Sequence, residues 1–283
     1  MALLGYAQSG SAVIVKSAGN SSIPVGAAVP SGESSSTNTI SHAIPSTAAG
    51  VIVSRVTTDE DVGRQLTGLG LNNIAVFHQN DAYGKAGLDG VTLALAGRNL
   101  KPIATATVER NSVDVAQAVA TLVAAKPQAI VQIGAYKACA AFIRAARAAN
   151  YGGTFYNVSF VGTQALADEL GKDGAGVVIS QVVPNPFSTT KPLTREFLDA
   201  IAKGGNKVQP NFSSLEGYLA AKLLAEGVRR AGSRLTRETL ITGLEAIGDT
   251  SFGGFSVSLG PDNHVASRFA ELSMLTGDGK VRT

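Results

Sequence analysis

Strand-like and helix-like segments alternate along the middle of the chain, and this alternation constrains the fold more than any other feature. The clearest unit starts at 73–77, where an apolar run passes through the polar turn HQNDAYG into a helix that ends near Ala96. Residues 129–133, AIVQI, are typical of a strand buried on both faces. Such alternation predicts a parallel sheet covered by helices. The other elements predicted here are strands at 103–108, 154–161 and 177–182 and helices at 113–125 and 137–149.

The two flanks of this block carry elements of their own. Thr236, before Arg237 and Glu238, is a suitable N-cap for one of the helices. Helices of the length expected after the block need a core, so we expect a second lobe built from both chain ends. The predicted elements of the flanks are a strand at 2–4, a helix-like stretch at 12–18, a strand at 24–28, helices at 192–203, 212–231 and 236–247, and strands at 255–259 and 269–275.

Composition excludes several classes of protein. The chain has 283 residues, 45% of them hydrophobic, so it can bury a large core. A net charge of +3 without a basic run gives no basis for a nucleic-acid partner. The single cysteine, Cys139, lies in an apolar helical run and is predicted to be a buried core residue. Three isolated histidines predict no metal site, and no apolar segment reaches the roughly 20 residues that span a bilayer.

The motifs of common enzymes are also missing from the sequence. It contains neither a Gly-x-Ser-x-Gly nucleophile elbow nor a Walker A loop. Glycines 84, 87 and 90 have the wrong spacing for a dinucleotide loop, and Lys85 is expected to be a surface charge. We therefore predict no catalytic residue and no cofactor.

Polar loops recur at the ends of predicted strands, and each carries a hydroxyl or aromatic side chain. Ligands of α/β sheets sit at such strand ends, so the recurrence predicts a site for a small polar molecule. For any one loop a purely structural role, such as capping backbone groups, remains open. The loops are 8–11, 29–32, 81–83, 134–136 and 158–160.

Several longer segments resemble the type I periplasmic binding proteins, of the leucine/isoleucine/valine-receptor type that serves ABC importers. The segments are 73–91, NIAVFHQNDAYGKAGLDGV, together with 113–153, 165–186 and 213–232. The resemblance implies two doubly wound α/β lobes, each with a parallel sheet, around a ligand cleft. Lobe I would comprise 1–57 with 185–270, and lobe II 58–184 with 271–283. Hinge closure would be absorbed near 56–58, 181–184 and 270–272.

The resemblance also implies which residues line the cleft. The two tyrosines would be cleft aromatics. Ser9, Ser31 and Gly32 would bind a ligand carboxylate, and the start of the helix at 212 would form a further wall. The implied ligand-binding residues are Ser9, Ser31, Gly32, Tyr83, Tyr136, Ser159, Phe212 and Ser213. Neutral donors in a closed cleft can hold a carboxylate without a counter-charge.

The sequence departs from the family pattern at Ser159, where amino-acid receptors of this type carry an acidic residue for the ligand ammonium. An unpaired buried ammonium is costly, so a carboxylate without an α-amine competes with an aliphatic amino acid as the expected ligand. Asp81 is the alternative partner for an ammonium.

The second departure is at the N-terminus, where the family has a signal peptide and two further βα units. From the sequence we expect a truncated receptor whose lobe I is incomplete. The resemblance implies a periplasmic or otherwise extracytoplasmic protein, monomeric at full length, that delivers its ligand to a membrane permease. A ligand-sensing regulatory domain of the same fold is the alternative within binding modules. A nucleotide-dependent or hydrolytic enzyme is the alternative from another class.

Overall fold

The computed structural model describes residues 2–4, 12–16, 49–52, 66, 68–205 and 208–283. The chain divides into two compact units. Unit 1 comprises Met1–Ser54 and Val183–Phe269, and unit 2 comprises Arg55–Val182 and Ala270–Thr283. In the described part of the chain, no helix is both long and apolar enough to cross a membrane.

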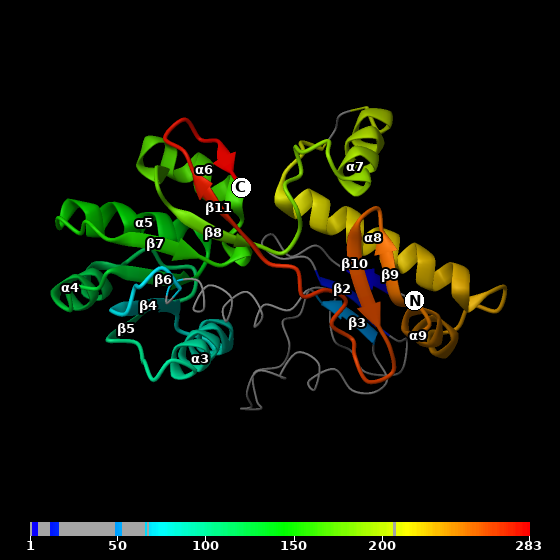
Figure 1. The fold of residues 1–283 in the computed structure, drawn as a ribbon, viewed down its shortest axis with the longest axis horizontal. Helices are drawn as coiled ribbons and strands as arrows, with labels where there is room; N and C mark the ends of the chain where they lie inside the picture. Colours follow the sequence, from blue (N-terminus) through cyan, green and yellow to red (C-terminus); the bar gives the residue numbers. More distant parts are fainter. Residues whose placement is uncertain (1, 5–11, 17–48, 53–65, 67, 206–207) are drawn as a thin grey trace. The chain divides into compact units, whose positions relative to one another are not determined.

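Unit 2 is built on a seven-stranded sheet with the strand order β12-β11-β8-β7-β6-β4-β5 (Figure 1). Five neighbouring strands, β8, β7, β6, β4 and β5, pair in parallel. Strand β11 pairs with β8 in antiparallel fashion, and β12 pairs with β11 in the same way. The mostly parallel α/β fold is therefore confirmed. The strands are β4 (Ile74–Gln79), β5 (Ala104–Val108), β6 (Ala129–Ile133), β7 (Thr154–Asn157), β8 (Val178–Gln181), β11 (Glu271–Leu275) and β12 (Val281–Arg282).

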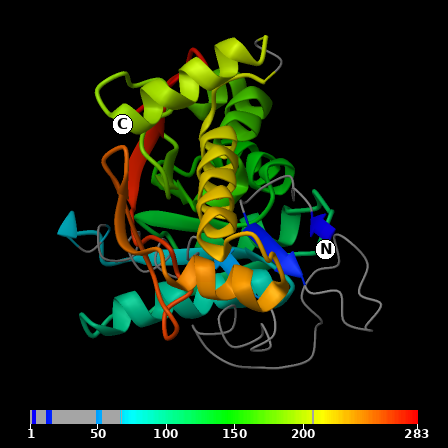
Figure 2. The same cartoon turned by 90° about the vertical axis from the view of Figure 1, so that its right-hand side faces the viewer.

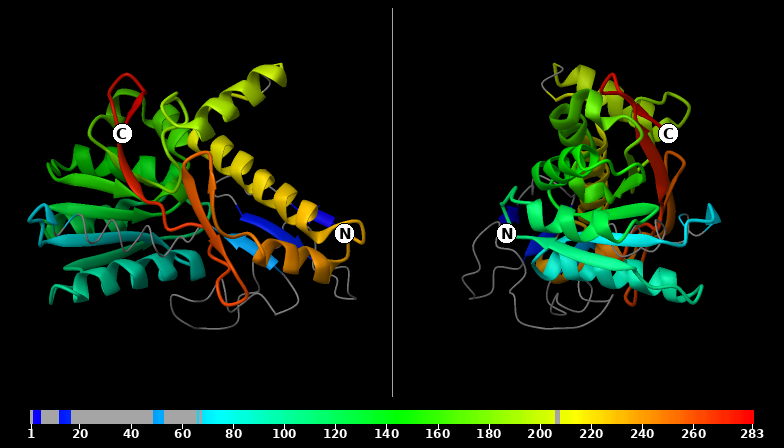
Figure 3. Two further views of the ribbon diagram at one scale, coloured as in Figure 1. Left: turned by 45° about the vertical axis from the view of Figure 1, so that its right-hand side comes forward. Right: turned by 90° about the vertical axis from the view of Figure 1, so that its left-hand side faces the viewer.

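Helices cover both faces of this sheet. In Figure 3, α3 lies on one face in teal, and the helices drawn in green lie on the other. Each face has its own apolar core, with Val91 of α3 buried on one side and Phe142 of α5 on the other. The Phe142 ring stacks on Phe77 at a centroid distance of 4.3 Å. The helical segments whose bounds are described are α3 (Ala82–Ala96), α4 (Ala116–Ala124), α5 (Tyr136–Ala148), η1 (Ser159–Val161), α6 (Thr163–Leu170) and η2 (Gly171–Gly174).

Helix α3 packs closely against the sheet because buried glycines form its inner face. Gly84, Gly87 and Gly90 are buried, and a Cβ atom on Gly87 would lie 2.6 Å from Cγ2 of Ile133 in β6. The glycine spacing that fails as a nucleotide loop is thus a packing feature. Lys85 is 70% exposed on the same helix, as the sequence predicts.

The described part of unit 1 contains three helices, a hairpin and a small sheet. Figure 2 shows α9 in orange crossing one end of α8 in yellow. Helices α7 (Pro192–Lys203) and α8 (Phe212–Ala231) have the bounds that the sequence predicts. Thr236 is the N-cap of α9 (Arg237–Glu245), as expected. Strands β9 (Gly248–Phe252) and β10 (Phe255–Leu259) pair in an antiparallel hairpin.

The N-terminal strands of unit 1 correct two predictions. The stretch expected to be helix-like at 12–18 forms strand β2 (Ala12–Lys16), because Ala-Val-Ile-Val is rich in β-branched residues and pairs on both sides. It pairs with β1 (Ala2–Leu4) and β3 (Ala49–Ile52), and both pairings are antiparallel. These described strands therefore do not form the parallel sheet expected for lobe I. The predicted strand at 24–28 lies outside the described residues.

Candidate functional site

Three of the predicted loops meet at one edge of the unit 2 sheet. Strands β4, β6 and β7 are neighbours and run in parallel, so their carboxyl ends lie at the same edge. The segment after β4 opens α3 at Ala82, and the segment after β6 opens α5 at Tyr136. The segment after β7 forms η1 from Ser159. Sequence-distant polar loops are thereby brought together where α/β sheets bind ligands.

An aromatic contact joins the first and third of these loops. The rings of Tyr83 and Phe160 pack with their centroids 4.4 Å apart at 51°. Both side chains are partly buried and lie against the apolar core on the α3 face. The backbone N–H of Ser159, next to Phe160, donates to Oγ of Ser180 in β8 at 3.3 Å. The structure therefore places Tyr83 close to the Ser159 loop.

Tyr136 lies at the same edge of the sheet but on its other face. Its ring packs in part against the core beneath α4, α5 and α6, and Nζ of Lys137 lies 6.0 Å from the ring centroid. Tyr136 is the first residue of α5, whose N-cap, Ala135, supplies no side-chain hydrogen bond. The N-cap of α6, Gly162, supplies none either. First-turn N–H groups without a side-chain cap favour an anion nearby.

The one acidic residue in these three loops, Asp81, is already engaged. Its Oδ1 accepts from the backbone N–H of Gly84 at 3.0 Å and caps α3. Its Oδ2 accepts from Nε2 of Gln79 and lies 3.7 Å from a guanidinium nitrogen of Arg110. These contacts compete with any role for Asp81 as the partner of a ligand ammonium.

A row of buried carboxamides, which the sequence reasoning missed, lies behind these loops. Four neighbouring strands each carry one near the carboxyl end, and each is on the face covered by α4, α5 and α6. The sequence pattern that could have revealed this row is a glutamine or asparagine at the last or next-to-last position of each strand. The residues are Gln79 in β4, Gln132 in β6, Asn157 in β7 and Gln181 in β8.

Two other predicted site residues, Phe212 and Ser213, are not part of this edge. Phe212 and Ser213 begin α8 in unit 1, where Phe212 is 4% exposed and Ser213 is half-buried. Ser9, Ser31 and Gly32 lie outside the described residues. Their part in a binding site stays a prediction.

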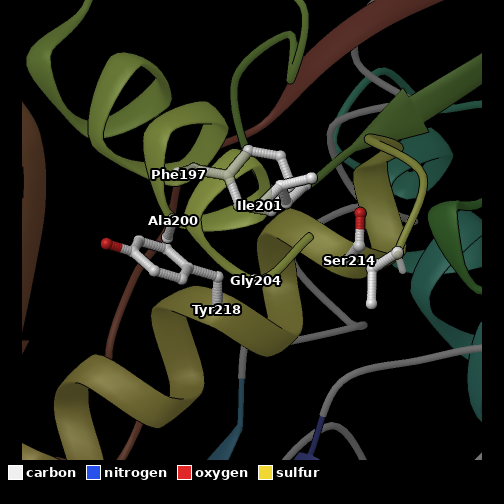
Figure 4. A pocket seen from close by; sticks show the side chains of 7 residues that line it. Phe197, Ala200, Ile201, Gly204, Ser214 and Tyr218 are labelled. Carbon is white, nitrogen blue, oxygen red and sulfur yellow. The ribbon is translucent and has the colours of Figure 1, made fainter. Parts of the chain in front are cut away.

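A separate groove lies in unit 1 between α7 and α8 (Figure 4). Its volume is about 260 Å³, and its walls are mostly apolar. Ser214, one of the two polar lining residues on α8, is engaged in the capping box with Asn211. Burial and a hydrogen bond to Glu196 raise the pKa of Tyr218 to about 12. The groove thus offers few polar groups that could orient a ligand. The lining residues are Phe197, Ala200, Ile201, Gly204, Val208, Ser214 and Tyr218.

Groups that could carry redox or metal chemistry are sparse in the described part. Cys139 is fully buried in α5, and burial raises the pKa of its thiol. Within the described ranges, no group of three or more His, Cys, Asp or Glu side chains could hold a metal ion.

Comparison with known proteins agrees with this architecture. The chain is 30% identical to a possible leucine/isoleucine/valine-binding protein from Rhodopirellula baltica SH 1, with a TM-score of 0.77 over 81% of this chain and 64% of that one. It is 32% identical to a substrate-binding periplasmic protein from Ralstonia solanacearum, with a TM-score of 0.73 over 80% and 65%. The chain therefore covers slightly less than two thirds of either relative.

A third solved structure shares the fold at lower identity. An extracellular ligand-binding receptor from Verminephrobacter eiseniae is 24% identical, with a TM-score of 0.69 over 82% of this chain and 67% of that one. A search of curated proteins finds no match. The sequence profile described as periplasmic binding protein matches residues 2–278, nearly the whole length. The chain belongs to the periplasmic binding protein family.

Proposed function

We propose that this chain is the solute-binding component of an ABC importer, which captures a small carboxylate-bearing solute outside the cytoplasm and presents it to a membrane permease. The observation that carries the proposal is the meeting of the loops of Tyr83, Tyr136 and Ser159 at the carboxyl edge of one parallel sheet, in a chain of this family. Two relatives above, one named as a leucine/isoleucine/valine-binding protein and one as a substrate-binding protein, support the same role.

The loop chemistry favours a carboxylate over a zwitterion. The N-termini of α5 and α6 lack side-chain caps, so their first-turn N–H groups favour negative charge. Ser159 is neutral, and Asp81 is engaged by the cap of α3 and by Arg110. A ligand ammonium at this edge would lack a free carboxylate in the three loops. We therefore expect an organic or aromatic acid without an α-amine to bind more tightly than leucine or valine.

Binding is proposed to use both units. The chain passes between them three times, at Ser54/Arg55, Val182/Val183 and Phe269/Ala270. Crossings of this kind absorb the backbone rotation of a hinge when two lobes close on a ligand. Ser9, Ser31, Gly32, Phe212 and Ser213 are the residues of unit 1 proposed to complete the site.

A thermal-shift screen followed by titration calorimetry tests this function. The probes are leucine, valine, their 2-oxo acid analogues and a set of aromatic carboxylates. A bound acid should raise the melting temperature, and Tyr83→Ala should weaken its binding at least tenfold. Lys85→Ala, two residues further along α3 and exposed, should leave affinity unchanged. Small-angle scattering should show compaction when the acid is added.

Two outcomes would contradict the proposal at different levels. Tight leucine binding without binding of the 2-oxo acids would refute the ligand chemistry but keep the receptor role. Failure of every small carboxylate and amino acid to bind would refute the receptor role for this chain.

A further inference from the structure

The row of carboxamides behind the candidate site is incompletely hydrogen-bonded. At one end, Gln181 is well satisfied, because its Nε2 donates to Oγ1 of Thr163 at 2.9 Å and to Oγ of Ser273 at 2.7 Å. Gln132 makes only a long bond, from Nε2 to the carbonyl oxygen of Cys139 at 3.5 Å. Asn157 lies on β7 between the strands that carry these two glutamines.

Three polar atoms in the middle of the row have no partner among the described residues. They are Oε1 of Gln132 and both Oδ1 and Nδ2 of Asn157. Both residues are 0% exposed. Because a buried amide without a hydrogen bond bears its full desolvation free energy, such groups in folded proteins are almost always satisfied by protein or by ordered water.

The positions of the two side chains allow one partner to serve both. Gln132 and Asn157 are register partners across β6 and β7. Ile130 and Phe155, two residues earlier on each strand, are also register partners and belong to the core on the α5 side. Since side chains alternate along a strand, Gln132 and Asn157 point to the same face as that pair. Neighbouring strands lie about 4.8 Å apart, so side chains at paired positions on one face are close enough for a single small molecule to bridge them.

We infer that Gln132 and Asn157 form an internal water site, in which one or two ordered waters bridge the two carboxamides. A water both donates and accepts, so it can satisfy Oε1 of Gln132 together with Oδ1 and Nδ2 of Asn157, which no single protein atom could do. Buried waters of this kind make about three hydrogen bonds and are costly to remove. Because Asn157 is two residues before Ser159, the site supports the loop after β7.

Direct observation of the native protein is the first test. A high-resolution crystal structure should show water density within hydrogen-bonding distance of Gln132 and Asn157. In solution, the Asn157 side-chain amide protons should show cross-relaxation with water that persists for longer than surface hydration. A structure in which the two carboxamides bond directly to each other, or in which no density lies between them, would overturn the inference.

A double-mutant cycle is the second test. If the amides were unsatisfied, Asn157→Leu would raise the melting temperature, because the desolvation cost would disappear. With bridging water, Asn157→Leu and Gln132→Leu each lower the melting temperature, since each change leaves the water and the other amide without a hydrogen-bond partner. The double variant should then lose less than the sum of the single losses, because neither amide remains to be satisfied. A rise in either single variant, or strictly additive losses, would refute the shared water. Gln181→Leu, whose amide bonds to protein, should be additive with both.

Discussion

The close approach of α3 to the sheet makes Gly87 a sharp test of the packing behind the candidate site. A methyl group at this position would lie 2.6 Å from Cγ2, 2.8 Å from Cδ1 and 3.0 Å from Cγ1 of Ile133. On an exposed helix, Gly→Ala would stabilise by about 1 kcal/mol. Overpacking of a well-filled core costs about 1–3 kcal/mol, and contacts this short favour the upper end. Gly87→Ala should therefore lower the free energy of unfolding by about 2 kcal/mol.

The assay is denaturant unfolding of four proteins: the parent chain, Gly87→Ala, Ile133→Ala and the double variant. Ile133→Ala alone should cost about 2–5 kcal/mol through the cavity it leaves. It also removes all three atoms that the new methyl group would meet. In that background Gly87→Ala should become neutral or stabilising by about 1 kcal/mol, so the two changes should be strongly coupled.

A glycine at the end of the same helix provides the control. Gly97 has φ −59°, and a Cβ there would be 3.5 Å from the carbonyl oxygen of Ala94, an ordinary contact. Gly97→Ala should stabilise the chain by about 0.4–1 kcal/mol through the unfolded state. If Gly87→Ala were as stable as Gly97→Ala, or cost the same with and without Ile133, the account of α3 packing would be wrong.

Three further predictions concern groups away from this contact. Cys139 should not react with a thiol reagent at pH 8 in the native protein but should react fully in denaturant, because its thiol is buried; rapid native labelling would contradict its placement. Asp81→Ala should cost about 1 kcal/mol through loss of the α3 cap, whereas Asp81→Asn, which retains a capping oxygen, should cost less by the same unfolding assay. Hydrogen bonds from Arg229 and Arg230 lower the pKa of Glu226 to about 2, below its usual 4.5. The contribution of Glu226 to folding stability is therefore fully present above pH 4.5 and is lost as pH falls towards 2. Unfolding measured across that window should be less pH-dependent in Glu226→Gln, and an unchanged profile would count against the arginine pairing.

Local sequence signals were sufficient to predict an element's bounds where residues at its own ends start or stop it. Strand β6 has its predicted bounds because a continuous apolar run follows the break at Lys126 and Pro127. The hairpin of β9 and β10 had an equally local signal that was missed. Gly253 and Gly254, with φ +60° and +87°, connect Phe252 to Phe255 and are typical of a two-residue turn between strands.

The candidate site was only partly predictable. The sequence placed Tyr83, Tyr136 and Ser159 at strand ends, and the structure has each of them there. It could not show that Tyr83 meets Phe160 whereas Tyr136 lies on the opposite face of the sheet. That depends on the strand order, which no local pattern encodes.

By itself, then, the sequence determined the α/β class, most element bounds in unit 2 and the presence of polar loops after the strands. It could do so because hydrophobic periodicity, helix caps and prolines act within a few residues of the chain. Tertiary structure decided the rest. Ala12–Lys16 is a strand because two antiparallel partners satisfy its backbone. Gln132 and Asn157 became neighbours only when β6 and β7 paired. Hydrogen bonding and burial between segments far apart in the chain are properties of the assembled sheet, so they become visible only once its strands are in order.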